Sequence, residues 1–391
     1  MTTRIDAPFL HDPALGRVLS ALTGAGHQAL VVGGAVRNAL LGQPTSDVDI
    51  ATSARPDETR RLCEAAGLRA VPTGIEHGTI TVVVDGTGFE VTTFRRDVET
   101  DGRRAIVAYS DRIDEDAHRR DFTMNALYAD ASGLVLDPVG GLPDLAARRL
   151  RFVGAPRERI REDFLRILRF YRFHAWYGAK GAADAEALGA CAELAGGLDG
   201  ISRERIGAET RKLLSAPDPT EAVTLMRDAG VLAHILHGAD PGHLAALVAV
   251  EQAIGAPADW QRRLALLGAT DPDCALRLSR DEARFHERLT ASLALPLPEA
   301  AYRFGAQIAR SAALISMARG ATPRAEWEDD IAQAASARLP IAAGDLMPEL
   351  AGPELGEALR RADAAFLASG FKLDPEALKL IALGRSDVMK G

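Results

Sequence analysis

The sequence predicts an α+β domain over residues 1–150, followed by an all-helical remainder. Two observations support this fold class. Up to about residue 150, short runs of β-branched residues alternate with helical patterns, and one pair of runs is joined by Asp-Gly, a strong hairpin signal. From about Arg157 onward the chain is rich in Ala, Leu, Arg and Glu, is broken by turn signals such as SAPDP, and holds no convincing strand.

The N-terminal elements follow from local patterns of burial, turns and caps. Pro near a helix start and Gly just past its end delimit the helices, and β-branched runs mark the strands. In chain order, we expect a strand at ALVV (29–32), a helix at GAVRNALLG (34–42), a strand at DVDIAT (47–52), a helix at RPDETRRLCEAAG (55–67) and a hairpin at GTITVVVDGTGFEVTTF (78–94).

The next segment, residues 95–116, is polar and highly charged. Its sequence is RRDVETDGRRAIVAYSDRIDED. Polar connections of this length commonly run over the surface, so we expect a mobile loop between the hairpin and the motif HRRDFTMNAL.

Length and composition limit the class of protein. A chain of 391 residues favours two or more domains, and 47% hydrophobic with 26% charged residues is ordinary for a globular protein. No apolar run is long enough for a membrane span, and the first residues do not form a secretory signal, so we expect a cytoplasmic protein. The net charge of −8 disfavours indiscriminate polyanion binding but permits a local nucleic-acid surface.

Cysteine spacing excludes two further classes. Cys63, Cys191 and Cys274 lie far apart, without the spacing of a zinc site or a disulfide framework. We therefore expect three buried thiols.

Two aspartates separated by one residue are the first chemical signal. If both lie on the strand 47–52, Asp47 and Asp49 project to the same face. Carboxylates held this close repel unless a cation neutralises them, and Mg²⁺ prefers such oxygen ligands. Glu90 on the second hairpin strand could supply a third carboxylate. The three carboxylates together would make a two-metal site for displacement at phosphorus.

An isolated Asp-x-Asp pair is more often a solvated strand end, so the flanking residues must decide. Gly33 and Gly34 allow a ligand to approach the backbone, the following helix start offers free N–H groups, and Arg37 adds a bidentate phosphate donor. This combination suits a nucleoside triphosphate. The chain lacks the P-loop and dinucleotide-binding motifs.

Several motifs in order now resemble one known family. The motifs are GGAVRNALLG with DVD, FEVTTFR, RRDFTMNAL, DPVGGLPDL and REDFLRILRFYRF, with a weaker match in SRERIGAE (202–209). With them, the segment from about residue 28 to 175 resembles the class II CCA-adding tRNA nucleotidyltransferases and bacterial poly(A) polymerases. This resemblance implies a polymerase-β-like nucleotidyltransferase head (1–150), a helical neck with a base-selecting helix (151–215), and a helical body and tail that bind tRNA (216–391).

The resemblance also implies roles for individual residues. It makes Asp47 and Asp49 the metal ligands, with Glu90 as the third catalytic carboxylate. Arg120 and Asp121 would recognise the ribose hydroxyls. The remaining implied nucleotide-binding residues are Asn125, which supports that corner, and Glu162, Arg169 and Arg172, which flank the base and triphosphate.

The motif EDFLRILRFYR has the period of an amphipathic helix, and its charged residues could be a solvated face. However, Asp163 and Arg166 lie three residues apart and offer an acceptor next to a donor fork. Cytosine and adenine present an amino donor beside ring acceptors and fit this pair, whereas uracil and guanine would point an oxygen at the carboxylate. In the family, these positions act as an amino-acid template.

One residue departs from the family pattern G-G-x-V-R-D. Asn38 occupies the position of the last Asp, and an amide can hydrogen-bond but cannot form an ion pair. The orientation of Arg37 therefore remains open at this point.

The leading hypothesis is template-independent addition of CCA to tRNA 3′ ends, with CTP, ATP and the tRNA acceptor arm as partners and Mg²⁺ as cofactor. No membrane or protein partner is implied. Alternatives are a poly(A) polymerase, a partial enzyme that adds only CC or only A, a non-catalytic RNA-binding module, and a small-molecule nucleotidyltransferase. The last would explain Asp-x-Asp but not the base-selecting motif.

Overall fold

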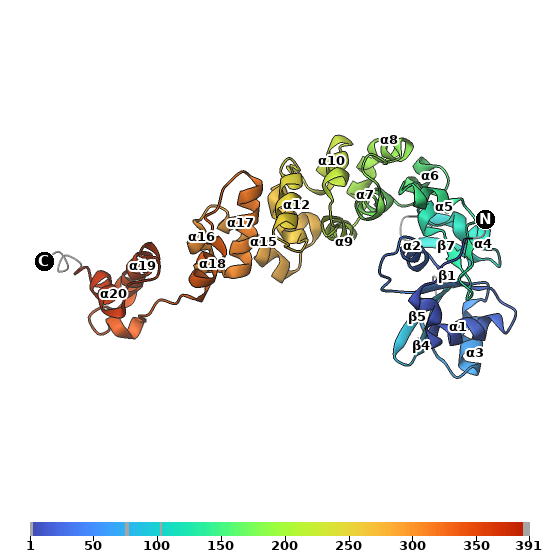
Figure 1. Cartoon of the computed structure of the whole chain (residues 1–391), viewed down its shortest axis with the longest axis horizontal. Helices are drawn as coiled ribbons and strands as arrows, with labels where there is room; N and C mark the ends of the chain where they lie inside the picture. Colours follow the sequence, from blue (N-terminus) through green and yellow to red (C-terminus); the bar gives the residue numbers. More distant parts are fainter. Residues whose placement is uncertain (1–2, 75–77, 102–103, 386–391) are drawn as a thin grey trace. The chain divides into compact units, whose positions relative to one another are not determined.

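The structure is a computed structural model that describes residues 3–74, 78–101 and 104–385. It divides into two compact units, residues 1–237 and 238–391. The first unit contains the described strands and the helices that follow them directly, whereas the second is helical (Figure 1). The fold class predicted from the sequence, an α+β head followed by an all-helical region, is confirmed. The finer boundaries at residues 150 and 215 stay predictions.

The strands of the first unit form a mixed seven-stranded sheet and a separate two-stranded ribbon. The order in the large sheet is β3-β4-β5-β2-β1-β8-β9, in which β2 and β5 run parallel and the other pairs run antiparallel. The strands are β1 (Ala29–Val32), β2 (Asp49–Thr52), β3 (Arg69–Gly74), β4 (Thr79–Val84), β5 (Thr87–Thr93), β6 (Arg95–Asp101), β7 (Arg104–Tyr109), β8 (Tyr128–Ala129) and β9 (Val135–Leu136).

Some helices of the first unit lie against the sheet, and the others follow it along the chain. Helices α1 and α3 pack on each other, and α3 also packs on β3, β4 and β5 (Figure 1). The helices are α1 (Pro13–Thr23), α2 (Gly34–Leu40), α3 (Pro56–Ala65), α4 (Ile113–His118), α5 (Gly141–Ala146), α6 (Pro156–Glu162), α7 (Leu165–Tyr177), α8 (Ala185–Glu193), α9 (Arg203–Leu214), α10 (Thr220–Asp228) and α11 (Val231–Ile235), with short 3-10 turns η1 (Pro8–His11), η3 (Thr123–Asn125) and η4 (Ala195–Gly200).

Strand register brings three segments to one end of the sheet. Val32, the last residue of β1, lies opposite Asp49, the first residue of β2, and also pairs with Tyr128. Leu30 and Val32 alternate along β1 into a buried cluster that contains Phe94 and Tyr128. The end of β1 and the start of β2 are therefore fixed next to each other by the core.

The local predictions for this unit are confirmed with one change. The expected strand 29–32, the two helices and the hairpin are present, and the hairpin turn has φ of 50° at Asp85 and 87° at Gly86, as a type I′ turn requires. Strand β2 begins at Asp49 rather than Asp47, so Asp47 lies in the loop before it. The two aspartates are not alternate residues of one strand.

The prediction of a mobile loop over residues 95–116 is wrong. Strands β6 and β7 pair as an antiparallel ribbon, and α4 follows. The sequence carried a signal for this, because Asp101-Gly102 is a hairpin dipeptide and AIVAY (105–109) is typical of a strand. The high charge of the segment favoured a loop over both of these signals.

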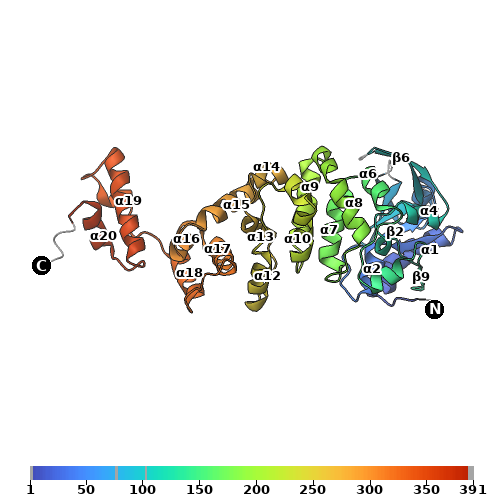
Figure 2. The same cartoon turned by 90° about the horizontal axis from the view of Figure 1, so that it is seen from above.

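The second unit is helical throughout its described residues. Helices α16, α17 and α18 pack on one another (Figure 2). The elements are α12 (Leu244–Ala253), α13 (Trp260–Leu267), α14 (Pro272–Leu276), α15 (Arg280–Ser292), α16 (Leu297–Phe304), α17 (Ala306–Ala318), α18 (Trp327–Ser336), η5 (Ala343–Leu346), α19 (Gly352–Ala368) and α20 (Pro375–Ala382). Within the described ranges, no helix has both the length and the apolar character needed to cross a membrane.

The cysteines are free thiols. Cys63 and Cys191 are buried as expected, and burial raises the pKa of Cys63 to about 11. Cys274 is exposed, so the expectation of three buried thiols is wrong at this position.

Candidate active site

Three carboxylates lie at the end of the sheet where β1 stops and β2 begins. Asp47 is in the loop, Asp49 opens β2, and Glu90 lies on the parallel neighbour β5, one residue before Val91, the partner of Ile50. All three residues are exposed. Desolvation and the negative charges of Glu90 and Asp47 raise the pKa of Asp49, which the positive charge of Arg120 opposes.

The carboxylates of Asp47, Asp49 and Glu90 are the ligand type of a divalent-cation site. They do not, however, form a single group that could hold the ion. Asp47 Oδ2 accepts a hydrogen bond of 2.9 Å from Ser46 Oγ. Over the described ranges, no three Asp, Glu, His or Cys side chains form a group that could hold a metal ion. The repulsion felt by Asp49 is nevertheless the kind that a dication relieves, and carboxylate oxygens are the ligands that Mg²⁺ prefers. The residues present therefore fit such an ion.

The glycine turn lies beside this carboxylate corner. Gly33 caps α2 with a φ of 71°, in the left-handed region that favours glycine. A Cβ at Gly33 would stand 3.6 Å from Arg120 Nη1 and from the carbonyl oxygen of Asn125, and a Cβ at Gly34 would stand 3.6 Å from Arg37 Nη2. The turn thus brings the backbone close to three of the predicted nucleotide-binding residues.

Arg37 does not present a free fork to a phosphate, which corrects its expected role. Arg37 is only 6% exposed, and burial lowers the pKa of its guanidinium. Nη1 donates to Asn125 Oδ1, and Nη2 donates to Tyr177 Oη at 2.8 Å. The guanidinium carbon also lies 3.9 Å from the centre of the Tyr177 ring. Arg37 therefore joins α2 to η3 and to the end of α7.

The structure settles how Asn38 affects Arg37. Asn38 Oδ1 accepts from Arg37 Nε at 3.2 Å and from Nη2 at 2.9 Å, while its amide nitrogen donates to the carbonyl oxygen of Pro44 at 2.8 Å. The amide thus keeps Arg37 oriented without an ion pair.

The predicted ribose corner is built on a buried carboxylate. Asp116 is fully buried and accepts hydrogen bonds from the guanidiniums of Arg119 and Arg120 and from Tyr128 Oη. Although burial alone would raise the pKa of Asp116, these donors hold it below its ordinary value. Arg120 uses Nε and Nη2 in these contacts and in a bond to Tyr128. No hydrogen-bond partner for its Nη1 lies among the described residues.

Asp121, next to Arg120, is held from three directions. Its Oδ1 accepts from the Phe122 backbone N–H at 2.8 Å and from Asn125 Nδ2 at 3.0 Å, and its Oδ2 accepts from both Nε and Nη2 of Arg169. Burial would raise the pKa of Asp121, but the charge of Arg169 and these hydrogen bonds lower it to about 2. The carboxylate therefore remains ionised.

The predicted base-selecting helix is interrupted between Glu162 and Leu165. Helix α6 ends at Glu162, Asp163 is extended with φ of −156°, and α7 begins at Leu165. Asp163 Oδ1 accepts from the Leu165 backbone N–H at 3.1 Å, and Oδ2 accepts from Arg205 Nη2 at 2.6 Å. The expectation of one continuous helix is wrong, because the extended backbone of Asp163 ends α6, and α7 starts anew after its N-cap residue Phe164.

Arg166, the second residue of α7, is also fixed by its neighbours. Its Nη1 donates to Glu162 Oε2 and, at 2.8 Å, to the carbonyl oxygen of Arg159. No partner for Nε or Nη2 of Arg166 is present in the described part of the chain. Asp163 and Arg166 are thus held by different residues and leave donor and acceptor capacity unused.

The two remaining predicted arginines complete one polar network. Arg172 Nε donates to Glu209 Oε2, and Arg169 Nη1 lies 3.9 Å from the other oxygen of Glu209. Since Arg169 also binds Asp121, the contacts run without a gap from α2 to α9. The chain of contacts is Arg37, Asn125, Asp121, Arg169, Glu209 and Arg172.

Several residues in these contacts were not predicted from the sequence. Asp116 fell in the segment expected to be a loop, and Tyr177 follows the last motif of the resemblance. Glu209 and Arg205 belong to SRERIGAE, whose order relative to the other motifs was the available signal. The residues that the sequence did not single out are Asp116, Tyr128, Arg159, Tyr177 and Glu209.

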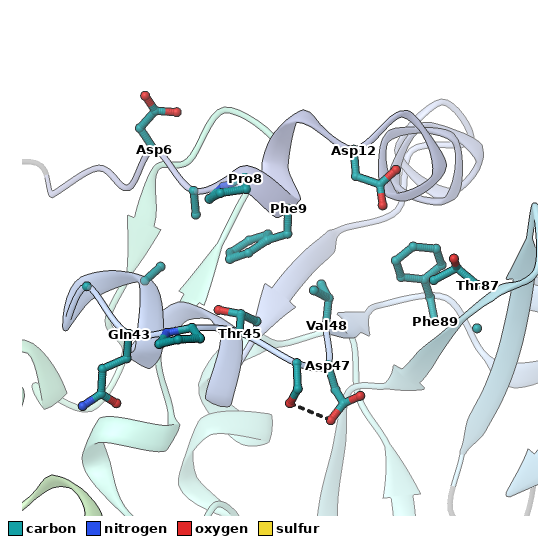
Figure 3. A pocket seen from close by; sticks show the side chains of 16 residues that line it. Asp6, Pro8, Phe9, Asp12, Gln43, Thr45, Asp47, Val48, Thr87 and Phe89 are labelled. Carbon is teal, nitrogen blue, oxygen red and sulfur yellow. Dashed lines mark hydrogen bonds between the residues drawn. The ribbon is translucent and has the colours of Figure 1, made fainter. Parts of the chain in front are cut away.

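A pocket of 820 Å³ adjoins the carboxylate loop (Figure 3). The loop residues Thr45 and Asp47 line it from one side, and Phe9 and Phe89 line it from the N-terminal segment and the hairpin. None of the ribose-corner or base-selecting residues belongs to its lining. This pocket is therefore separate from the polar network.

Two family models match separate parts of the chain, almost entirely within the first unit. The family model described as "Poly A polymerase head domain" matches residues 29–151, and the model described as "Probable RNA and SrmB- binding site of polymerase A" matches residues 184–244.

Relatives and solved structures agree with these matches. Over 211 residues the chain is 41% identical to CCA tRNA nucleotidyltransferase 1, mitochondrial, of Homo sapiens. This match covers 54% of this chain and 49% of the human protein. Over 202 residues the chain is 46% identical to the CCA-adding enzyme of Streptococcus gordonii. This match covers 51% of this chain and 49% of that enzyme. The chain thus spans about half the length of the curated relatives it matches.

The crystal structure of the Bacillus stearothermophilus CCA-adding enzyme in complex with CTP has a TM-score of 0.75 and 29% identity, and covers 96% of this chain and 98% of that chain. The Thermotoga maritima CCA-adding enzyme complexed with tRNA, with a TM-score of 0.69 and 19% identity over 97% of this chain and 96% of that one, shows a similar fold.

Proposed function

The chain belongs to the family of the class II CCA-adding enzymes and poly(A) polymerases, and we propose that it adds CCA to tRNA 3′ ends, using CTP and ATP. The observation that supports this proposal is that Asp163 and Arg166 lie beside the network that holds Asp121. The charge of Asp163 acts on Arg169, which binds Asp121. Arg166 donates to the carbonyl oxygen of Arg159, whose guanidinium donates to the carbonyl oxygen of Arg120. The names of the similar relatives support the same activity.

The carboxylates form the reaction end of the proposed site. Proteins of this family typically use divalent metal ions, and we propose Mg²⁺. Asp47 and Asp49 would hold it, and Glu90 would add negative charge from β5. When bound, such ions activate an attacking hydroxyl and stabilise the leaving phosphate oxygens. The arginines beside this corner, above all Arg120, moderate the repulsion between the carboxylates.

The sugar would bind where Arg120 and Asp121 meet the glycine turn. Arg120 Nη1 lies beside Gly33, while the other nitrogens of the guanidinium are fixed by Asp116 and Tyr128. A donor held in this way needs no reorganisation when it meets a ribose or phosphate oxygen. Asp121, with a pKa of about 2, stays ionised at any physiological pH, and a ribose hydroxyl that binds it would replace one of the four hydrogen bonds that its oxygens accept. This gives a physical reason to prefer NTP over dNTP.

Base choice would follow from fixed hydrogen-bond polarity. The Asp163 carboxylate can only accept and the free nitrogens of Arg166 can only donate, so the pair matches the amino donor and ring acceptors of cytosine and adenine. Uracil O4 or guanine O6 would oppose the carboxylate, at a cost of about 1–3 kcal/mol or more. Arg205 and Glu162 hold the two side chains in place, which keeps this polarity fixed.

A labelled-nucleotide assay tests the proposal. The protein is incubated with Mg²⁺, one labelled NTP at a time, and tRNA transcripts that end before CCA, after CC, or after CCA. We expect CTP and then ATP to be incorporated, with no addition beyond CCA. Long A tails on any RNA would instead show a poly(A) polymerase, the activity after which the matching head-domain model is named. Addition of CC alone or A alone would show a partial enzyme.

A paired variant separates catalysis from RNA binding. Asp49→Asn removes one proposed metal ligand and should abolish incorporation while tRNA binding, measured by filter retention, stays within about twofold. Asp85→Asn is the matched control, because Asp85 lies in the exposed hairpin turn, where Asn accepts a positive φ. Retained incorporation in Asp49→Asn would remove the metal assignment. Wild-type protein that binds tRNA but incorporates nothing would indicate a non-catalytic RNA-binding module.

The compartment stays a prediction. Similar proteins of mouse and human are described as mitochondrial, whereas others are bacterial. Cytoplasmic localisation therefore rests on the sequence alone.

A further inference from the structure

We propose that Asn38 is a positioning residue for the carboxylate site, because its amide ties the loop that carries Asp47 to the buried guanidinium of Arg37. The inference rests on the proposed function only in that it treats Asp47 and Asp49 as metal-binding. The contacts that support it are independent of tRNA and of the nucleotide.

The loop in question, residues 42–48, joins α2 to β2. It holds Asp47 and leads directly into Asp49. Between the ends of this loop, the hydrogen bonds that connect it to α2 both involve Asn38. Asn38 Nδ2 donates to the carbonyl oxygen of Pro44 at 2.8 Å, and the carbonyl oxygen of Asn38 accepts from the Gln43 backbone N–H at 2.8 Å.

The other end of the amide is anchored in the core. Asn38 Oδ1 accepts two hydrogen bonds from Arg37, and Arg37 in turn is buried against Tyr177 and bonded to Asn125. Because Arg37 can move little within these contacts, the Asn38 side chain is held in one orientation. The loop therefore takes its position from a guanidinium that the head and the neck helix α7 hold together.

The chemistry of this bridge requires an amide. An arginine has no acceptor and a proline carbonyl has no donor, so the residue between them must accept on one side and donate on the other. An aspartate in place of Asn38 could accept from Arg37, but its second oxygen would face the Pro44 carbonyl oxygen without a proton between them. Asparagine meets both demands at this side-chain length.

The bridge predicts a specific consequence of Asn38→Asp. The carboxylate would pair with Arg37 and repel the Pro44 carbonyl oxygen, so the loop would lose its side-chain attachment and keep only the backbone hydrogen bond from Gln43 to Asn38. Asp47 would then sample more positions, and a divalent ion would bind more weakly. One lost hydrogen bond of ordinary strength corresponds to a change of about fivefold to tenfold in the dissociation constant.

The experiment measures the loop and the ion without turnover. Mn²⁺ binding to full-length protein is followed by electron paramagnetic resonance, with no nucleotide or tRNA, and hydrogen exchange is followed in peptides that cover residues 41–48. For Asn38→Asp we expect about fivefold to tenfold weaker Mn²⁺ binding and about tenfold faster exchange at Gln43, with tRNA affinity and melting temperature unchanged.

Gln43→Glu is the control, because it adds the same negative charge to the same loop, and the structure gives the Gln43 side chain no hydrogen bond to Arg37 or Pro44. Asn38→Ala, which removes both halves of the bridge, should show the same loop exchange and replaces Asn38→Asp if the latter does not fold. Unchanged Mn²⁺ affinity or exchange in the Asn38 variants, or an equal loss in Gln43→Glu, overturns the proposal. Because neither readout needs CCA addition, a failure of the proposed function would appear separately, as absent incorporation with normal Mn²⁺ binding.

Discussion

Asp163→Asn should reduce the preference for CTP over UTP. In the wild-type structure both oxygens of Asp163 already accept a hydrogen bond, from Leu165 N at 3.1 Å and from Arg205 Nη2 at 2.6 Å. An asparagine must turn its nitrogen toward one of these donors. The longer bond to Leu165 is the weaker of the two, so we expect the amide nitrogen on that side and the oxygen toward Arg205.

The magnitude follows from the hydrogen bonds that change. Cytosine loses a charged acceptor for its amino group, which is worth about 1.5–3 kcal/mol. Uracil gains a possible donor for O4 where it previously met an anion. At about 1.4 kcal/mol for each factor of ten, the ratio of kcat/KM for CTP to that for UTP should fall by about 10- to 100-fold.

The assay is primer extension on a tRNA transcript that ends before CCA, with CTP and UTP measured separately. Asp199→Asn in η4 is the matched control, because Asp199 belongs to the same unit and is largely exposed at its pair with His234. A CTP to UTP ratio that stays within twofold of the wild type, or that falls equally in the control, would refute the assignment of Asp163 to base reading.

Three further predictions test packing and buried charges in the two units. Because the pKa of Asp121 lies below its ordinary value, the Asp121–Arg169 pair stabilises the fold above about pH 4 and loses this effect as pH falls through about 2; in urea titrations, wild type should exceed Asp121→Asn by about 2 kcal/mol at pH 5, with the difference vanishing near pH 2, and a constant difference would contradict this. Gly141→Ala places a Cβ 2.2 Å from the carbonyl oxygen of Thr123 and should cost about 1–3 kcal/mol in thermal unfolding, whereas Gly16→Ala, with open space around it, should not destabilise. In the second unit, Glu251→Gln removes the carboxylate shared by the buried Arg262 and Arg263 and should cost about 3–5 kcal/mol, while Glu376→Gln, exposed at 83%, should change stability by less than about 0.5 kcal/mol.

Local patterns predicted most of the fold, because the signals involved are short-range. The strand 29–32, its following helix and the Asp85-Gly86 hairpin each depend on burial period and turn chemistry within a few residues. The ribbon of β6 and β7 was missed because charge in residues 95–116 outweighed a weaker strand pattern. The break at Asp163 was missed because the hydrophobic period continues across it and only the backbone of one residue departs from the helix.

The candidate site was predictable as a set of residues but not as a set of contacts. Motif order brought Asp121, Arg169 and their neighbours into one hypothesis, and the structure places them within one network. Sequence could not show that Arg37 turns inward, since a guanidinium next to a glycine turn can serve a ligand or the core. Which of the two it serves depends on Tyr177, 140 positions along the chain.

The alternation of negative and positive side chains from Asp121 through Arg169 and Glu209 to Arg172 has an evolutionary consequence. Replacing one member by a neutral residue leaves its partner charged in a poorly hydrated place, so single changes are costly and paired changes are tolerated. Across homologous sequences, Asp121 and Arg169 should therefore vary together, as should Glu209 and Arg172. Lineages in which one partner is lost should carry a compensating change in the other.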